Sequence, residues 1–219
     1  MNRGFSPAPD RPAPVALGIV GICTLLELAL TLGGTPTLGG DGMRRTALIY
    51  GAFWPRVIDS WAPAWPGQPA AMFFTYAFLH GGVMHLLFNM LILVHLSRET
   101  VARVGQQGFV LFYLFTAAGG AAGFWLLSSA PGPMVGASGA VFGLFGATQY
   151  WDYQRRRAAG ATLRPFWNLL IGLSLMNVAL FALFGGYLAW QAHLGGYVAG
   201  FVLAWVITPT LRHRFRGFG

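Results

Sequence analysis

The stretch PGPMVGASGAVFGLFGATQYW, residues 131–151, combines a helix break with a helix face of small residues. Its Pro131-Gly132-Pro133 cannot continue a helix, and the apolar run that follows predicts a helix over residues 137–151 with Ser138 in its first turn. Backbone N–H groups there have no intrahelical acceptor and the helix dipole is positive, so an oxyanion formed at Ser138 would be stabilised. Taken alone, however, these glycines are more typical of close helix packing than of a hydrolase.

The composition around this stretch is that of a membrane protein. Of the 219 residues, 55% are hydrophobic and 9% are charged, and a soluble domain of this length cannot bury so much apolar surface. The net charge of +8 does not indicate a nucleic-acid partner, because the 14 basic residues, all arginine, fall in short gaps between apolar runs. The single cysteine, Cys23, excludes an intrachain disulfide and a cysteine-rich metal site.

Six apolar stretches are candidates for spanning helices, which need about 20 residues each. They cover residues 14–33, 81–97, 108–128, 137–151, 166–185 and 187–208. The sequence therefore predicts an all-α membrane protein: a six-helix domain over 14–210, an N-terminal tail over 1–13 and a basic tail over 211–219. We expect the long loop 34–80, rich in Trp and Phe, to dip into the outer leaflet rather than form a separate domain.

The arginines predict the orientation of these spans. With six spans, 11 arginines lie on one side: Arg3, Arg11, Arg98, Arg103, Arg155, Arg156, Arg157, Arg164, Arg212, Arg214 and Arg216. The other side has three, Arg44, Arg45 and Arg56. The positive-inside rule then predicts that both termini are cytoplasmic, in what we expect to be a bacterial inner (plasma) membrane.

Counting residues from the cytoplasmic face predicts the depth of the polar side chains. Ser138 lies 14 residues before Asp152, which is roughly 21 Å of helix in a hydrocarbon layer about 30 Å thick, so it sits roughly 9 Å below the outer face. His193 lies about 14 residues from the inner end of its helix, and His85 lies 13 residues from Arg98. These three side chains are therefore expected at one depth, with Asn89 one turn deeper on the face of His85.

Polar residues inside a membrane are candidates for function, and these four suit serine chemistry. Gly196 and Gly200 follow His193 on one helical face and predict close approach to Gly139 and Gly143. No carboxylate suits a third position, so we expect a dyad in which His193 is the base for Ser138. Glu27, inside the first span, is interpreted as a packed, hydrogen-bonded carboxylate. No metal site is predicted, because the histidines lack His-Glu-x-x-His spacing.

At this point the chain resembles the rhomboid intramembrane serine proteases. The resemblance rests on His85-Leu-Leu-Phe-Asn89, on Gly136-Ala-Ser138-Gly139, and on Ala192-His193-Leu-Gly-Gly196-Tyr-Val-Ala-Gly200. It implies a Ser138–His193 dyad, an oxyanion hole formed by His85, Asn89 and the N–H of Ser138, and no cofactor. It also implies that single-pass transmembrane proteins are cleaved in or near their spanning segment, through an acyl-enzyme.

Two departures from the family pattern concern residues around this site. The Trp-Arg pair that many members carry is replaced by Ala71-Met72, so that loop anchor is missing or replaced. Bacterial members often have Tyr four residues after the serine, whereas this chain has Phe142, which can stack but offers no hydroxyl.

Two other functions remain open. The first is a non-catalytic rhomboid-like protein that binds or escorts membrane helices, although such relatives typically lack the serine or the histidine. The second is a small transporter with a polar site at the midplane, but the sequence shows no convincing repeat of broken helices.

Overall fold

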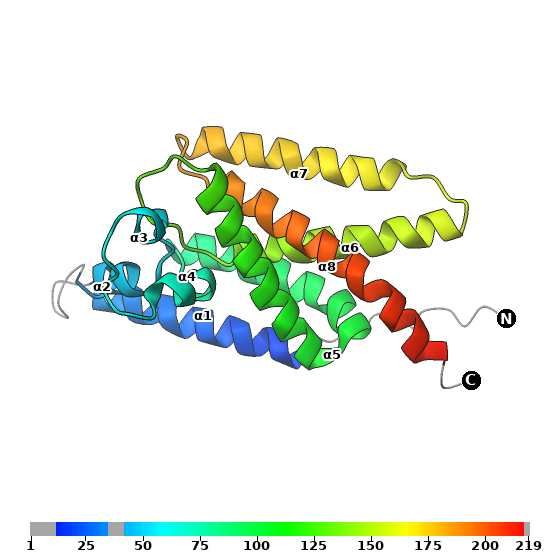
Figure 1. Cartoon of the computed structure of the whole chain (residues 1–219), viewed down its shortest axis with the longest axis horizontal. Coiled ribbons are helices and arrows are strands. Elements are labelled where there is room, and N and C mark those ends of the chain that lie inside the picture. The colour runs from blue at the N-terminus through cyan, green and yellow to red at the C-terminus, as the bar shows by residue number, and fades with distance from the viewer. Residues whose placement is uncertain (1–11, 35–41, 217–219) are drawn as a thin grey trace.

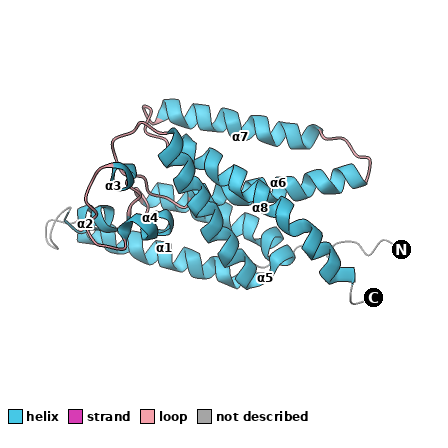
Figure 2. Cartoon of the chain, viewed as in Figure 1, coloured by secondary structure: helices cyan, strands magenta, loops and turns pink. Residues whose placement is uncertain are grey.

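The computed structural model describes residues 12–34 and 42–216 and is built from helices (Figures 1 and 2). Between Phe53 and Met134 there is one isolated β-bridge. The helices, in chain order, are α1 (Pro14–Gly33), α2 (Gly42–Gly51), α3 (Pro55–Asp59), α4 (Gln68–Thr75), the 3-10 turn η2 (Tyr76–Phe78), α5 (Val83–Leu127), α6 (Ser138–Ala158), α7 (Arg164–Leu183) and α8 (Trp190–Arg216).

The all-α fold predicted from the sequence is confirmed, but several boundaries were wrong. The spans predicted at 81–97 and 108–128 form the two helical arms of α5, which are separated at Gly105, where φ is 76° and ψ is 175°. The residues between them are mostly good helix formers, and Glu99 accepts a hydrogen bond from Arg103 one turn later. The first arm therefore continues past the predicted end at 97, and the break between the two arms lies at Gly105.

The last three helices also differ from the prediction at their boundaries. Helix α6 continues past the predicted end at 151 to Ala158, and its Asp152 pairs with Arg155 and Arg156 in the following turn. Helix α7 ends at Leu183 rather than 185, before Gly185 and Gly186, which adopt positive φ values of 59° and 88°, and α8 begins at Trp190 rather than 187. Helix α8 also passes Pro209 and continues to Arg216, through part of the predicted tail 211–219.

The predicted loop 34–80 contains helices α2, α3 and α4. Prolines at the first turns of α3 and α4 suit helix starts, a signal that the interpretation as loop overlooked. The segment is tied to the bundle, since Phe53 and Met134 exchange backbone hydrogen bonds of 3.0 and 2.9 Å. The Trp125 indole also donates to Asp59 at 2.9 Å.

Helix α8 packs closely against both α5 and α6, as the predicted glycine contacts require. A Cβ atom on Gly196 would lie 1.9 Å from the Gly139 carbonyl oxygen, and one on Gly200 would lie 1.8 Å from that of Gly143. On the α5 side, a Cβ on Gly195 would lie 2.4 Å from the carbonyl oxygen of Gly119. Only glycine fits at these backbone contacts.

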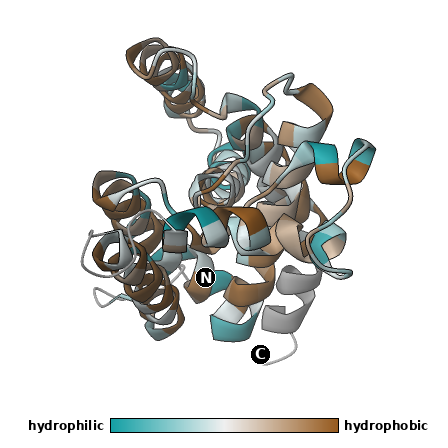
Figure 3. Ribbon diagram, turned by 90° about the vertical axis from the view of Figure 1, so that its left-hand side faces the viewer, coloured by the Kyte–Doolittle hydropathy of each residue, from teal (hydrophilic) through white to brown (hydrophobic). Residues whose placement is uncertain are grey.

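Helix α7 is the least packed of the long helices. It stands apart at the top of Figures 1 and 3, where its surface is largely apolar. Of the residues in its most apolar 18-residue stretch, 6% are buried. Four helices in the described ranges are long and apolar enough to cross a membrane: α1, α5, α7 and residues 190–208 of α8. With α6 and the two arms of α5 counted separately, they make a bundle of six long segments. Their exposed apolar faces indicate an integral membrane protein.

Candidate active site

Ser138 and His193 lie in hydrogen-bond contact at the α6–α8 interface. Ser138 is the first residue of α6, and His193 lies in the first turn of α8. His193 Nε2 is 2.9 Å from Ser138 Oγ. The histidine is 6% exposed, whereas the serine is half-buried. Because Gly139 and Gly196 meet one residue after the serine and three after the histidine, their packing brings the two side chains together.

The loop before Ser138 is held by hydrogen bonds from its backbone. The N–H of Gly136 donates to the Tyr76 carbonyl at 3.0 Å, and the N–H of Ala137 donates to His80 Nε2 at 3.4 Å. Burial, together with nearby His85, lowers the pKa of His80 to about 4, so its imidazole is neutral and can accept. The next N–H, that of Ser138, occupies the first position of α6, where a helix supplies no acceptor.

His85 lies against this loop, and its proton can be assigned from its partner. A Cβ atom on Gly136 would lie 2.6 Å from His85 Cε1 and 2.8 Å from Nε2, so only glycine fits under the ring. The N–H of Gly81 donates to Nδ1 at 3.3 Å. In the neutral ring the proton is therefore on Nε2, which faces the loop before Ser138 as a donor.

Asn89 is buried one helical turn beyond His85. Its Nδ2 donates to the His85 carbonyl oxygen at 2.8 Å, which uses one of two N–H groups and leaves a second. Asn89 thus belongs to the same face of α5 as His85.

Phe142 covers one face of the His193 ring. Its ring lies 4.1 Å from the imidazole, centroid to centroid, with 2° between the planes. The Phe142 ring in turn makes an edge contact with the Phe145 ring, with 5.9 Å between the ring centroids. Stacked rings restrict rotation of the histidine, and this contact needs no hydroxyl.

The sequence interpretation missed Asn177 of α7, which contacts the second nitrogen of His193. Asn177 Oδ1 lies 2.5 Å from His193 Nδ1. The signal that singled out Asn89, a polar side chain inside an apolar span, applied equally to Asn177. The group at this third position is an amide, not a carboxylate.

Glu27 and Arg44 join α1 and α2 to the segment before α5. The Arg44 guanidinium donates to Glu27 at 2.7 Å and to the His80 carbonyl oxygen at 2.9 Å. The interpretation of Glu27 as a packed, hydrogen-bonded carboxylate is confirmed. Where Trp-Arg is replaced by Ala71-Met72, Gln68 ties the loop instead, through 2.7 Å bonds with Ala64 N–H and the Ile49 carbonyl.

The site joins a hydroxyl, a buried histidine and a group that orients the histidine, the arrangement that serine nucleophiles use. The described residues contain no cluster of three His, Cys, Asp or Glu side chains placed to hold a metal.

Comparison with known proteins places this chain in a family. Residues 67–210 match the family model described as "Rhomboid domain". The chain is 38% identical over 144 residues to RHOMBOID-like protein 1 of Arabidopsis thaliana, which covers 61% of the chain and 33% of that protein. It is 29% identical over 180 residues to Rhomboid protease GluP of Bacillus subtilis (82% and 31%). It is 25% identical over 206 residues to Rhomboid protease GlpG of Serratia proteamaculans (94% and 66%).

The chain therefore spans about a third of the first two relatives and 66% of the third. The matched region holds Ser138, His193 and all their described partners. This chain belongs to the rhomboid family.

Proposed function

We propose that the chain is an intramembrane serine endopeptidase that cleaves single-pass transmembrane proteins in or near their spanning segment. The observation that carries the proposal is the 2.9 Å contact between His193 Nε2 and Ser138 Oγ at the N-terminus of α6. Two of the relatives are named rhomboid proteases. The apolar faces of the bundle suit substrates that reach the site from lipid.

In the proposed mechanism, Ser138 Oγ attacks the scissile carbonyl carbon while His193 Nε2 takes the hydroxyl proton. The oxyanion is stabilised by the N–H of Ser138, by Nε2–H of His85 and by the free N–H of Asn89. Collapse of the intermediate breaks the C–N bond, and His193 returns its proton to the leaving amine. Water, activated by His193, then attacks the acyl-enzyme and releases the acid, which restores Ser138.

Water must reach this site from one side of the membrane. We place Ser138 in the outer half, because α6 is 21 residues long, about 31 Å, and carries its arginines at the opposite end. The loop before Ser138 runs inward from the end of the bundle where α2 and α3 lie (Figure 1).

Purified protein in proteoliposomes, with a fluorogenic transmembrane substrate, tests the proposal. The wild type is expected to cleave the substrate and to be labelled by a fluorophosphonate at Ser138. Ser138→Ala is expected to lose both activities, whereas Ser174→Ala, at an exposed position on α7, retains them. Labelling or cleavage that persists in Ser138→Ala would overturn the assignment. Wild-type protein that binds the substrate without turnover would favour a non-catalytic, helix-binding relative.

A further inference from the structure

Asn177 is held in one orientation by two hydrogen bonds that use opposite ends of its amide. Its Nδ2 lies 2.9 Å from the Leu173 carbonyl oxygen, one turn earlier in α7. Its Oδ1 lies 2.5 Å from His193 Nδ1. A carbonyl oxygen can only accept, so the amide group facing Leu173 must be the NH₂, and the oxygen faces the histidine.

This orientation determines the tautomer of His193. Because Asn177 Oδ1 can only accept, His193 Nδ1 must carry a proton. In the neutral ring Nε2 then has a free lone pair, and that nitrogen lies 2.9 Å from Ser138 Oγ. This is the tautomer that a general base requires, since the lone pair faces the hydroxyl proton.

We infer that Asn177 is a positioning residue that keeps His193 in this tautomer and stabilises its protonated form, so that the site works as a serine–histidine–asparagine chain. The inference rests on the proposed function. Three helices then supply the chain, with Ser138 on α6, His193 on α8 and Asn177 on α7. In the described part of the structure, no other side-chain hydrogen bond joins α7 to α8.

A purely structural role for Asn177, in which it only holds α7 against the bundle, can be distinguished from a role in positioning His193. Helix α7 has a second tie near its start, where Gln149 Nε2 donates to the Phe166 carbonyl at 2.7 Å. Gln149 also accepts a hydrogen bond from the Tyr197 hydroxyl of α8 at 2.7 Å, so Gln149→Ala removes one tie of α7 and one of α8 but leaves both contacts of His193 in place. If Asn177 only fastened α7, the two substitutions would have the same effect on catalysis.

The experiment compares four variants with wild type by cleavage kinetics in proteoliposomes between pH 5 and pH 9. Asn177→Ala is expected to lower kcat about 10- to 100-fold with little change in KM, the loss expected for one hydrogen bond to a charged group. Its activity should persist to lower pH on the acid side, because the protonated imidazole loses an acceptor. Asn177→Asp should move the acid limb the opposite way and recover much of kcat, since a carboxylate accepts the same proton.

The other two variants are controls. Ser174→Ala, on the same helix, should match wild type, and Gln149→Ala should leave the acid limb in place. His85, the other titratable group that acts on His193, is the same in all variants. An acid limb and kcat unchanged in Asn177→Ala would overturn the inference while wild type still cleaves. If Asn177→Ala does not fold, an unshifted acid limb in Asn177→Asp overturns it equally. A wild type that neither cleaves nor reacts with fluorophosphonate refutes the proposed function instead.

Discussion

Gly136, which has no side chain, controls the relative position of His85 and Ser138. Its φ of 126° is accessible mainly to glycine, and the His85 ring fills the space where a Cβ would stand. Its N–H is meanwhile bonded to the Tyr76 carbonyl. The distance between His85 and Ser138 is therefore set through the backbone of this residue.

Gly136→Ala should reduce cleavage about 100-fold while leaving the protein folded, because displacement of a catalytic group by about 1 Å costs that much. Gly132→Ala is the matched control in the same loop, since a Cβ there meets nothing within 4 Å. Cleavage rates and thermal unfolding of both variants check the prediction. Equal cleavage by the two proteins would show that His85 is not placed by Gly136.

At the scale of elements, α8 owes its position to glycines on two of its faces. A methyl group on Gly196 would press against the backbone of Gly139, which has no rotamer that relieves the contact. Gly196→Ala should therefore separate α8 from α6, destabilise the protein by about 1–3 kcal/mol or more, and abolish cleavage.

Unfolding in mild detergent measures this effect, and Gly172→Ala in α7 is its control. The control position has open space around it, so the alanine should be neutral or slightly stabilising through its helix propensity. A Gly196→Ala protein as stable as Gly172→Ala would contradict the packing described for α6 and α8.

The ion pair between α1 and α2 supports a second prediction at this scale. Arg44→Ala leaves the Glu27 side chain, 1% exposed, without its cation, and should cost about 2–3 kcal/mol because Arg44 is itself 28% exposed. Arg45→Ala, at an exposed position of the same helix, should cost almost nothing. Adding Glu27→Gln to Arg44→Ala should restore part of the lost stability. Thermal unfolding of the wild type and these three variants measures the losses of stability. Equal losses for Arg44→Ala and Arg45→Ala would contradict the stabilising role of the ion pair.

Much of this arrangement was predictable, and the failures have physical causes. Ser138 and His193 were visible because polar residues are rare in apolar runs, and the spacing of Gly196 and Gly200 predicted the α6–α8 contact. Asn177 was missed because it is not part of a recognisable motif. Its polar side chain in an apolar span was the one signal that could have identified it. The end of α6 was misplaced because hydropathy ends at Asp152, whereas arginines continue a helix well.

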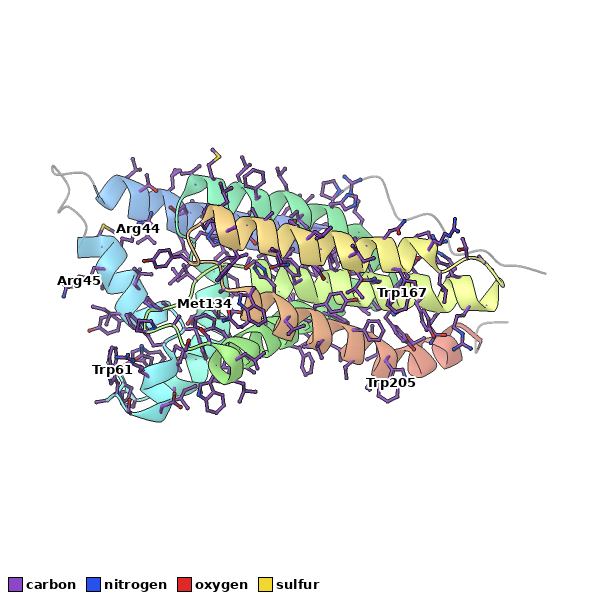
Figure 4. The ribbon with its side chains drawn as sticks, turned by 90° about the horizontal axis from the view of Figure 1, so that it is seen from above. Arg44, Arg45, Trp61, Met134, Trp167 and Trp205 are labelled. Atoms are coloured by element: carbon purple, nitrogen blue, oxygen red, sulfur yellow. The ribbon has the colours of Figure 1, made fainter. Side chains whose placement is uncertain are left out.

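At the scale of the whole molecule, the two ends of the bundle both carry exposed tryptophans but differ in their arginine content. Figure 4 shows Arg44, Arg45 and Trp61 toward one end and Trp167 and Trp205 toward the other. The three tryptophans are between 46% and 59% exposed, as side chains at the two membrane interfaces would be. Arg155, Arg156, Arg157 and Arg164 lie around the α6–α7 connection at that end.

This asymmetry predicts the topology. A fluorescent-protein reporter after Gly219 should be active in the cytoplasm, and alkaline phosphatase at the same place should be inactive, because the arginine-rich end is retained inside. Phosphatase inserted after Gly186, in the α7–α8 loop, should be active outside. An active phosphatase at the C-terminus would contradict the proposed orientation.

The position of His193 on α8, later in the chain than Ser138 and Asn177, has a consequence for biosynthesis. Ser138 is made 55 residues before its partner, and α6 and α7 are synthesised before α8. The hydrogen bond between serine and histidine cannot form until α8 is synthesised and lies between α5 and α6. During synthesis the chain therefore carries an unpaired serine, and the complete series of hydrogen bonds from Ser138 to Asn177 appears only once α8 has inserted.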